Sequence, residues 1–253
     1  MNDFTLVGGP TSVFEHASLR WLTDPAFSPP GDYDYLTKLT GPAVEPDAVG
    51  DIDVVLLSHD HHPDNLDPGG REFLPRAGRV LTTAAGADRL GGNAIGLEPW
   101  SSVELDAPGD GAAVTVTAVP AQHGPDGTDH ITGPVIGFVL SAPGTDTIYV
   151  SGDNASLDVV RQVAQRAGPI DVAVLFAGAV QLAQRFDGAY LTLSSDRAAE
   201  AAKILGARLV VPVHFEGWKH FTQGADALRA AFAGNQVTDV LRMPERGETL
   251  TLG

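Results

Sequence analysis

The pattern of apolar and polar positions predicts that the N-terminal part of the chain consists mainly of β-strands. Its apolar runs are short, and they are separated by turns rich in glycine, proline and aspartate, which is typical of strands rather than helices. The strands predicted on this basis are residues 4–8, 12–15, 19–23, 54–58, 80–82, 103–105, 114–119, 135–140 and 147–151.

The C-terminal part combines strands with helices. Residues 172–176 and 209–213 are continuously apolar, as expected of strands that helices cover on both faces. Two amphipathic helices are predicted between serine caps and glycine stops, within 156–168 and 194–206. A third, short helix is predicted at 225–231.

The first segment with evident chemistry directly follows a predicted strand. Residues 57–67 hold three histidines and three aspartates, which are His59, His61, His62, Asp60, Asp64 and Asp67. Imidazole nitrogen and carboxylate oxygen suit zinc, manganese or iron, and a loop at the end of a buried strand can present several of them together. The segment therefore predicts metal ligands rather than an ordinary polar turn.

Three later strand ends carry one more histidine or aspartate each. His123, Asp153 and His214 stand shortly after predicted strands. Gly152, just before Asp153, allows a close backbone approach. Ser156 is the better cap for the helix that follows, which leaves the Asp153 carboxylate free. Together with the histidine-rich segment, these residues predict a metal centre where four strand ends meet.

The order of these segments resembles the metallo-β-lactamase superfamily over nearly the whole chain. The SHDHxxxxLD-like start and the PVHFEGW end are similar to the branch that contains L-ascorbate-phosphate lactonase and the N-acylphosphatidylethanolamine-cleaving phospholipase. The resemblance implies an α+β fold, a four-layer αββα sandwich of two mixed sheets with helices on the outer faces. This architecture accommodates all the elements predicted above.

The histidine-rich segment departs from the superfamily pattern His-x-His-x-Asp-His, because it is one residue longer. Either His61 or His62 pairs with His59. The run from His62 to Asp64 keeps the usual spacing and slightly favours His62, and His61 stays an alternative. In both alignments Asn65 stands at the place of the last histidine, and its neutral amide oxygen is a weaker ligand than imidazole. The departure puts the second metal position in doubt.

The resemblance implies two groups of ligands for one or two divalent transition metals, zinc before manganese or iron. The first group comprises His59, one of His61 and His62, and His123, and the second comprises Asp64, Asp153 and His214, with Asp153 shared. Asp64 and Asp153 would then take the catalytic role. A metal-bound hydroxide, available at neutral pH, would attack the substrate.

Further residues near the ligands are candidates for the pocket wall or for acceptors that orient the imidazoles. They are Asp60, Asn65, Asp67, Glu216, Trp218 and His220. His130 lies in a polar loop that is a candidate cover for the substrate, and the loop 177–186 is a candidate pocket edge. We expect an ordinary structural role for His16.

Composition narrows the choice of function. The chain carries 32 acidic and 16 basic residues, a net charge of −16, and no cysteine. This charge disfavours nucleic acid and anionic membranes as partners, and the lack of cysteine excludes disulfides and thiolate ligands. The sequence contains no evident targeting signal, membrane span or linker. We therefore expect a soluble cytoplasmic protein in which residues 1–253 form a single domain, with homo-oligomerisation left open.

These observations favour a metal-dependent hydrolase that acts on a small-molecule lactone or ester. The negative charge slightly favours such substrates over a phosphodiester. Two alternatives stay open. One is a phosphodiesterase or phospholipase of the same fold, and the other is a metal-binding sensor or scaffold without catalysis, which the departure at Asn65 keeps under consideration.

Overall fold

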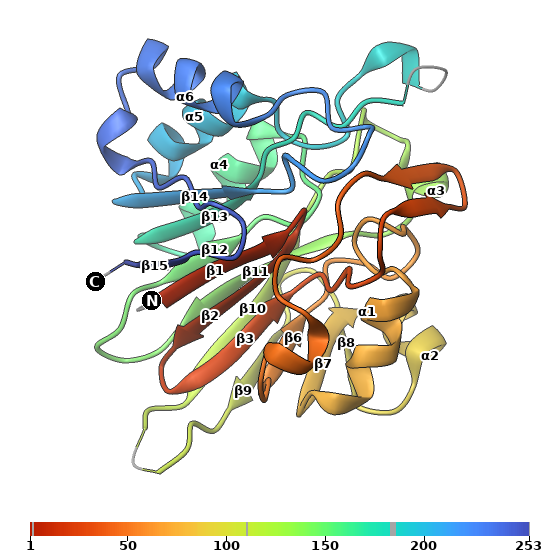
Figure 1. Ribbon diagram of the computed structural model, residues 1–253. Coiled ribbons are helices and arrows are strands. Elements are labelled where there is room, and N and C mark those ends of the chain that lie inside the picture. Colours follow the sequence, from red (N-terminus) through yellow and green to blue (C-terminus); the bar gives the residue numbers. More distant parts are fainter. Residues whose placement is uncertain (2, 110, 183–185, 253) are drawn as a thin grey trace.

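Two β-sheets face each other in the computed structural model, which describes residues 1, 3–109, 111–182 and 186–252 (Figure 1). Across the first sheet the strands are β15 (Thr249–Thr251), β1 (Asp3–Gly8), β2 (Thr11–His16), β3 (Leu19–Thr23), β6 (Val54–Leu56), β7 (Arg79–Thr83) and β8 (Ala94–Leu97). Across the second they are β14 (Leu209–Val213), β13 (Val172–Phe176), β12 (Ile148–Val150), β11 (Ile136–Ser141), β10 (Val114–Pro120) and β9 (Ser102–Leu105). A separate pair is formed by β4 (Gly31–Tyr33) and β5 (Leu36–Lys38).

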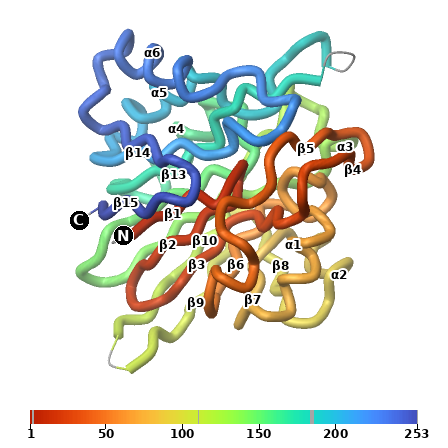
Figure 2. Tube along the Cα trace, in the orientation of Figure 1, coloured from red at the N-terminus to blue at the C-terminus, as the bar shows by residue number. Residues whose placement is uncertain are grey.

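Both sheets are mixed, as predicted. In the first sheet β15 to β3 run antiparallel and β3 to β8 run parallel. In the second sheet β9 to β12 run antiparallel and β12 to β14 run parallel. The two ends of the described chain lie side by side, because β15 pairs with β1 (Figure 2).

Successive side chains along the strands of the first sheet pack alternately into two different hydrophobic cores. Phe14 and Trp21 belong to the large core that also contains residues of the second sheet, whereas Val13 and Leu22 belong to a smaller core together with Phe73. Successive side chains of a strand point to opposite faces of its sheet. The first sheet is therefore covered by the second sheet on one face and by a helix on the other.

The helices are α1 (Pro68–Phe73), α2 (Ala84–Leu90), α3 (Asp129–Thr132), α4 (Leu157–Arg166), α5 (Ser195–Leu205) and α6 (Ala225–Gly234). In Figure 1, α1 and α2 lie beside the parallel strands of the first sheet, and α4 to α6 lie beside those of the second. The arrangement is the predicted four-layer αββα sandwich. Among the described residues, the structure contains no helix with the length and apolar character needed to cross a membrane.

The predicted caps of α4 and α5 are confirmed. The Ser156 side chain accepts a hydrogen bond from Val159 N, and the Ser194 side chain accepts one from Arg197 N. Gly206 ends α5 in the left-handed conformation, with φ of 62°, which glycine adopts without steric cost. Since Ser156 caps α4, the Asp153 carboxylate is not needed for that purpose.

The short helices α1 and α2 were not predicted, because tertiary packing rather than helix propensity determines them. The sequence of α1 contains two glycines and a proline, a composition that disfavours a helix when it is taken alone. A Cβ at Gly70 would overlap with the Pro25 carbonyl, so this helix can pack closely against the chain after β3 only with glycine there. The predicted strand 54–58 ends earlier, at Leu56, because Ser58 N donates instead to the Asp24 carboxylate.

His16 is a structural residue whose burial makes stability depend on pH. Its side chain is buried at the end of β2, and burial lowers its pKa to about 4. The unfolded chain binds a proton near pH 6.5 and the folded chain does not, so stability falls as the pH falls from 6.5 to 4. We expect His16→Gln to remove on the order of 2 kcal/mol of this loss between pH 7 and pH 4, measured by urea unfolding. His130→Gln, at an exposed histidine, serves as the control, and equal pH profiles for the two variants would contradict the assignment.

Candidate metal centre

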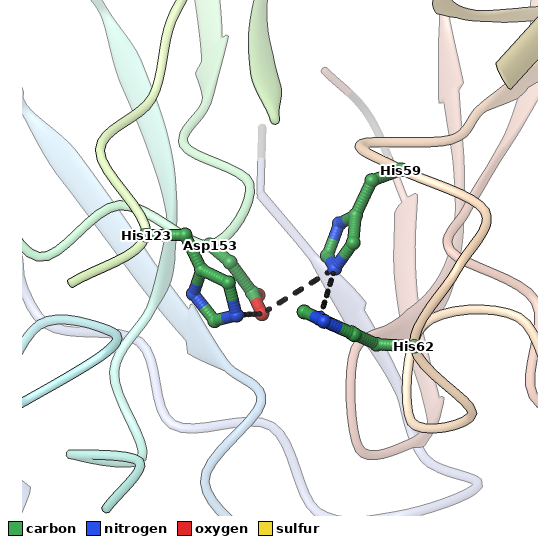
Figure 3. Close-up of side chains that lie close together, drawn as sticks. All are labelled: His59, His62, His123 and Asp153. Carbon is green, nitrogen blue, oxygen red and sulfur yellow. Dashed lines mark hydrogen bonds and ion pairs between the residues drawn. The ribbon is translucent and has the colours of Figure 1, made fainter. Parts of the chain in front are cut away.

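Four segments of the chain bring histidine and aspartate side chains together at one edge of the sandwich. They are residues 57–67 after β6 and the loops that follow β10, β12 and β14. Figure 3 shows four of these side chains pointing toward one another. Strand ends are rigid supports. Four of the candidate ligands stand within three residues of one, namely His59, His123, Asp153 and His214.

The first group of candidate ligands consists of His59, His62, His123 and Asp153, whose ligand atoms lie within 4.8 Å of one another. His59 Nε2 is 2.8 Å from His62 Nδ1, and Asp153 Oδ2 is 3.6 Å from His123 Nε2 (Figure 3). Burial lowers the pKa of His62 to about 3 and that of His123 to about 4, and it holds the pKa of His59 well below its usual range. The three imidazoles are therefore neutral at pH 7, which is the form that binds metals.

The second group consists of Asp64, Asp153 and His214. His214 Nε2 is 3.2 Å from Asp64 Oδ2 and 3.7 Å from Asp153 Oδ1. Burial alone would raise the pKa of Asp64, but the neighbouring His220 and His214 outweigh it and hold that pKa well below the usual range. Asp153 belongs to both groups and turns one carboxylate oxygen toward each.

The environment of Asp153 indicates whether a cation fits this cluster. Its side chain is 1% exposed, and its Oδ2 has no hydrogen-bond partner among the described residues. Burial raises the pKa of Asp153 to about 7. A buried carboxylate with an oxygen that accepts no hydrogen bond is costly unless a cation neutralises it. The cluster of neutral imidazoles and unsatisfied carboxylate oxygen therefore fits a divalent metal ion.

In two of the imidazoles a hydrogen bond at Nδ1 leaves Nε2 available to bind a metal. His59 Nδ1 lies 2.9 Å from Ser58 Oγ, which itself donates to Asp24 Oδ2 at 2.7 Å. His123 Nδ1 lies 2.7 Å from the carbonyl oxygen of Leu191. Each Nδ1 thus carries the proton and donates it, so that Nε2 faces the cluster with a free lone pair, as is usual for metal-binding histidines.

Asp24, immediately after β3, is an organising residue that sequence analysis missed. It is 1% exposed, and it accepts from Ser58 N at 2.6 Å, Ser58 Oγ at 2.7 Å and Asn65 Nδ2 at 3.0 Å. Burial raises the pKa of Asp24 to about 7, although these hydrogen bonds oppose the shift. The only signal in the sequence was an aspartate directly after a predicted strand, the same signal that identified Asp153.

Residues 20–215 match the protein family described as Beta-lactamase superfamily domain. The chain belongs to this superfamily. One relative is a UPF0173 metal-dependent hydrolase from Methanosphaerula palustris, 31% identical over 204 residues, which are 78% of this chain and 84% of that protein. The chain is accordingly a metal-dependent hydrolase of the superfamily, with a histidine and aspartate cluster able to bind metal ions.

Solved structures of other proteins confirm the predicted fold. The structure is similar to an isothiocyanate hydrolase from Delia radicum gut bacteria, with a TM-score of 0.82, 20% identity and 99% of both chains covered. It is also similar to a metallo hydrolase from the archaeon Ignicoccus hospitalis, with a TM-score of 0.71, 20% identity, and 100% of this chain and 98% of that chain covered. At these identities the likeness supports the metallo-β-lactamase fold and nothing about the substrate.

In this superfamily member His61 and His62, the two alternatives left by the sequence, face different partners. His62 belongs to the first group of candidate ligands, whereas His61 belongs to neither group. The His61 Nε2 instead contacts the carbonyl oxygen of Thr132 in α3, and Nδ1 lies 3.9 Å from Asp60 Oδ1. His61 therefore connects the histidine-rich segment to α3, which borders the site.

We expect His62→Ala and His61→Ala to differ in metal content. His62→Ala removes an imidazole from the first group, so bound metal should fall from about two ions per chain to about one. His61→Ala removes only the contact with α3, so metal content should not change. Elemental analysis of the purified variants measures the difference. Loss of metal in His61→Ala together with full retention in His62→Ala would reverse this assignment.

Three residues predicted to assist the ligands have other roles. Asp67 contacts no imidazole, because Phe27 N, Ser28 N, Lys38 Nζ and Gly70 N occupy both of its carboxylate oxygens. This corrects the expectation that it orients a ligand.

Asp60 pairs mainly with Arg89, whose hydrogen bonds help to hold its pKa below the usual range although burial opposes the shift. Its one approach to an imidazole is that to His61. Glu216 accepts from Gly9 N at 2.8 Å and lies 3.5 Å from Arg246, so it too orients no candidate ligand.

A pocket opens onto the cluster. It is lined by Tyr35, Leu36, His62, Asp64, His123, Ile131, Thr132, Val180, Leu182, Phe186, Leu191 and His220. The prediction that the loop 177–186 forms a pocket edge is supported at Val180, Leu182 and Phe186, while residues 183–185 lie outside the described residues. Trp218 is buried behind His220, with its ring centroid 6.1 Å away, and does not line the pocket.

Proposed function

We propose that this protein hydrolyses a small, uncharged lactone or ester with an apolar substituent, using one or two divalent transition metals, with zinc before manganese or iron. The observation that supports this proposal best is that six of the twelve side chains lining the pocket beside the cluster are apolar. A divalent cation bound there lowers the pKa of coordinated water and polarises the bond to be broken. The chain's own residues bind the cation, orient the substrate and exclude bulk water.

The chemistry of the pocket wall supports an uncharged substrate. Apolar side chains come from β5 at Leu36, from α3 at Ile131, and from the loop after β13 at Val180. Ile131 is 52% exposed at the rim, where an apolar substituent would cover it. Burying apolar surface contributes about 25 cal/mol per Å². Such a wall therefore favours a hydrophobic substituent close to the reacting bond.

Charge supports a carbon electrophile over a phosphodiester. None of the described residues that line the pocket is lysine or arginine, and the whole chain carries a charge of −16. Arg89, on the far side of the histidine-rich segment, is already paired with Asp60. A phosphodiester would have to enter against a negative field and find no cationic side chain. The same argument disfavours nucleic acid and anionic membrane surfaces.

Within this proposal Asp64 and Asp153 take the catalytic role. Both carboxylates are buried at the base of the cluster, at 4% and 1% exposure. They supply the negative charge that holds the cation next to the pocket. Asp64 also lines the pocket, so its carboxylate would hold the cation beside the bound substrate.

A substrate panel tests the proposal. The zinc-, manganese- and iron-loaded protein is offered homoserine lactones with short and long acyl chains, nitrophenyl esters, an aryl isothiocyanate and bis(nitrophenyl) phosphate. The isothiocyanate is included because the similar Delia radicum gut bacterial protein hydrolyses that class, and because it too is a neutral carbon electrophile. We expect turnover of at least one neutral substrate, with kcat/KM rising about tenfold for each two or so added methylenes.

The alternatives predict different outcomes of the same panel. Turnover of bis(nitrophenyl) phosphate alone would favour the phosphodiesterase or phospholipase. Stoichiometric metal without turnover of any substrate would favour the sensor or scaffold. The likeness to the lactonase and phospholipase branch, the single-domain organisation, the oligomeric state and the cytoplasmic location stay predictions from sequence.

A further inference from the structure

Asn65 turns its amide nitrogen, rather than its oxygen, toward the second group of ligands. Its Nδ2 is 3.0 Å from Asp24 Oδ2 and 3.3 Å from Asp153 Oδ1. Carboxylates only accept hydrogen bonds, so both contacts require the NH2 end of the amide. An amide held in this way presents a donor to Asp153 Oδ1, and its own oxygen has no hydrogen-bond partner among the described residues. Asn65 thus contacts the second group as a hydrogen-bond donor, and its role as a pocket residue or an indirect partner of the ligands stays a prediction.

His220 contacts Asp64 of the second group without being one of the three residues that define it. Its Nε2 is 2.9 Å from Asp64 Oδ2, the same oxygen that His214 Nε2 approaches at 3.2 Å. The His220 side chain is 8% exposed, and its Nδ1 has no hydrogen-bond partner among the described residues. Two imidazole nitrogens thus converge on one carboxylate oxygen, in a cluster that already contains Asp153.

The loop that carries His220 is fixed from several directions. Lys219 N donates to Thr37 O at 3.0 Å, which connects the loop to β5. The ring of Phe221 packs against both imidazoles, with centroids 4.3 Å from His214 and 4.7 Å from His220. Trp218 lies behind His220. The imidazole is therefore held in position before any cation binds, as an effective ligand must be.

We propose that His220 is the fourth protein ligand of the second metal position, together with Asp64, Asp153 and His214, and that it supplies the imidazole that Asn65 lacks. This inference rests on the proposed function, because it concerns the same metal-dependent centre. It assigns two imidazoles and two carboxylates to the second position. Such a set suits zinc, and it removes the reason to doubt that this position can be filled.

The test measures zinc per chain by elemental analysis and zinc affinity by competition with a chromogenic chelator. His220→Ala and His220→Gln should both lose one of about two ions per chain. The affinity of the weaker position should fall on the order of 100-fold or more, since loss of even an indirect partner of a ligand costs 10–100-fold. The affinity of the other position should stay unchanged. His130→Gln is the matched control at an exposed histidine.

The outcomes separate this inference from the proposed function. Two ions per chain with unchanged affinity in a folded His220→Gln variant would overturn the assignment of His220 and leave the hydrolase proposal standing. If His220→Ala does not fold, as judged by circular dichroism, His220→Gln decides, because it keeps a polar side chain of similar length beside Asp64. A wild-type protein that binds no zinc, manganese or iron would overturn both proposals.

Discussion

Replacing Asp153 by asparagine should reduce hydrolysis by about 10³-fold or more, the largest effect we expect from a single substitution. Asp153 is the one residue shared by both groups of candidate ligands. An amide in its place removes a negative charge from both positions at once. Metal-assisted stabilisation amounts to several kcal/mol, and about 4 kcal/mol corresponds to a thousandfold in rate. Elemental analysis and turnover of the best substrate from the panel measure the two effects together.

The same substitution should stabilise the metal-free protein. Because burial raises the pKa of Asp153 above its unfolded value, ionisation costs stability, and this cost appears as the pH rises from about 4 to about 7. Asp153→Asn removes that cost. The metal-free variant should therefore melt at a higher temperature than metal-free wild type at pH 8, and the difference should shrink toward pH 4. A functional site that is destabilising on its own is a common trade-off.

Asp158→Asn is the matched control for both measurements. Asp158 lies in the first turn of α4, and its side chain is 85% exposed, so the same chemical change there should alter neither metal content nor turnover. An Asp153→Asn variant that still binds two ions and turns over within tenfold of wild type would show that this carboxylate is not shared by two metals.

Much of the fold could be predicted because local patterns and tertiary structure agree along most strands. The continuously apolar runs became β13 and β14, in which every residue is buried. Local pattern and tertiary structure disagree only in segments where a contact with a distant part of the chain determines which residue fits. Gly70 is such a case, because it disfavours a helix locally and is required by the close approach of Pro25. The six-residue sequence of α1 alone cannot reveal a contact with a residue as distant as Pro25.

The candidate site was predictable to the extent that its residues stand at strand ends. Asp153 and His214 were found from a run of apolar residues followed by a polar one. Asp24 stands in the same relation to β3, yet a single aspartate before a proline reads equally as a turn. The opposite orientations of His61 and His62 depend on α3, which a polar loop sequence does not reveal. The hydrogen-bonding direction of the Asn65 amide depends on two distant carboxylates and is visible only in the folded structure.

Removing the Asp24 carboxylate should have the largest effect on stability among residues that do not face the pocket. Asp24→Ala leaves Ser58 N and Ser58 Oγ without their acceptor in a fully buried site, and it leaves Asn65 Nδ2 with only the longer contact to Asp153 Oδ1. Each unsatisfied buried donor costs about 1–3 kcal/mol. Relief of the buried charge offsets part of this loss, so the free energy of unfolding should fall by about 3–5 kcal/mol. Urea unfolding of the metal-free protein measures the change.

The Asp24→Ala substitution should also weaken zinc binding by 10- to 100-fold, because Ser58 then no longer holds His59 in the orientation that frees Nε2. Asp24→Asn distinguishes the effect of losing the negative charge from the effect of losing the side-chain volume. It keeps the size of the side chain but can offer only one acceptor atom, so its effects should lie between those of wild type and Asp24→Ala. Asp51→Ala, at an exposed aspartate before β6, should change neither quantity. If Asp24→Ala unfolds within 1 kcal/mol of wild type and binds zinc equally well, then the segment 57–67 is held by its own packing, and the chain after β3 has no part in positioning the metal ligands.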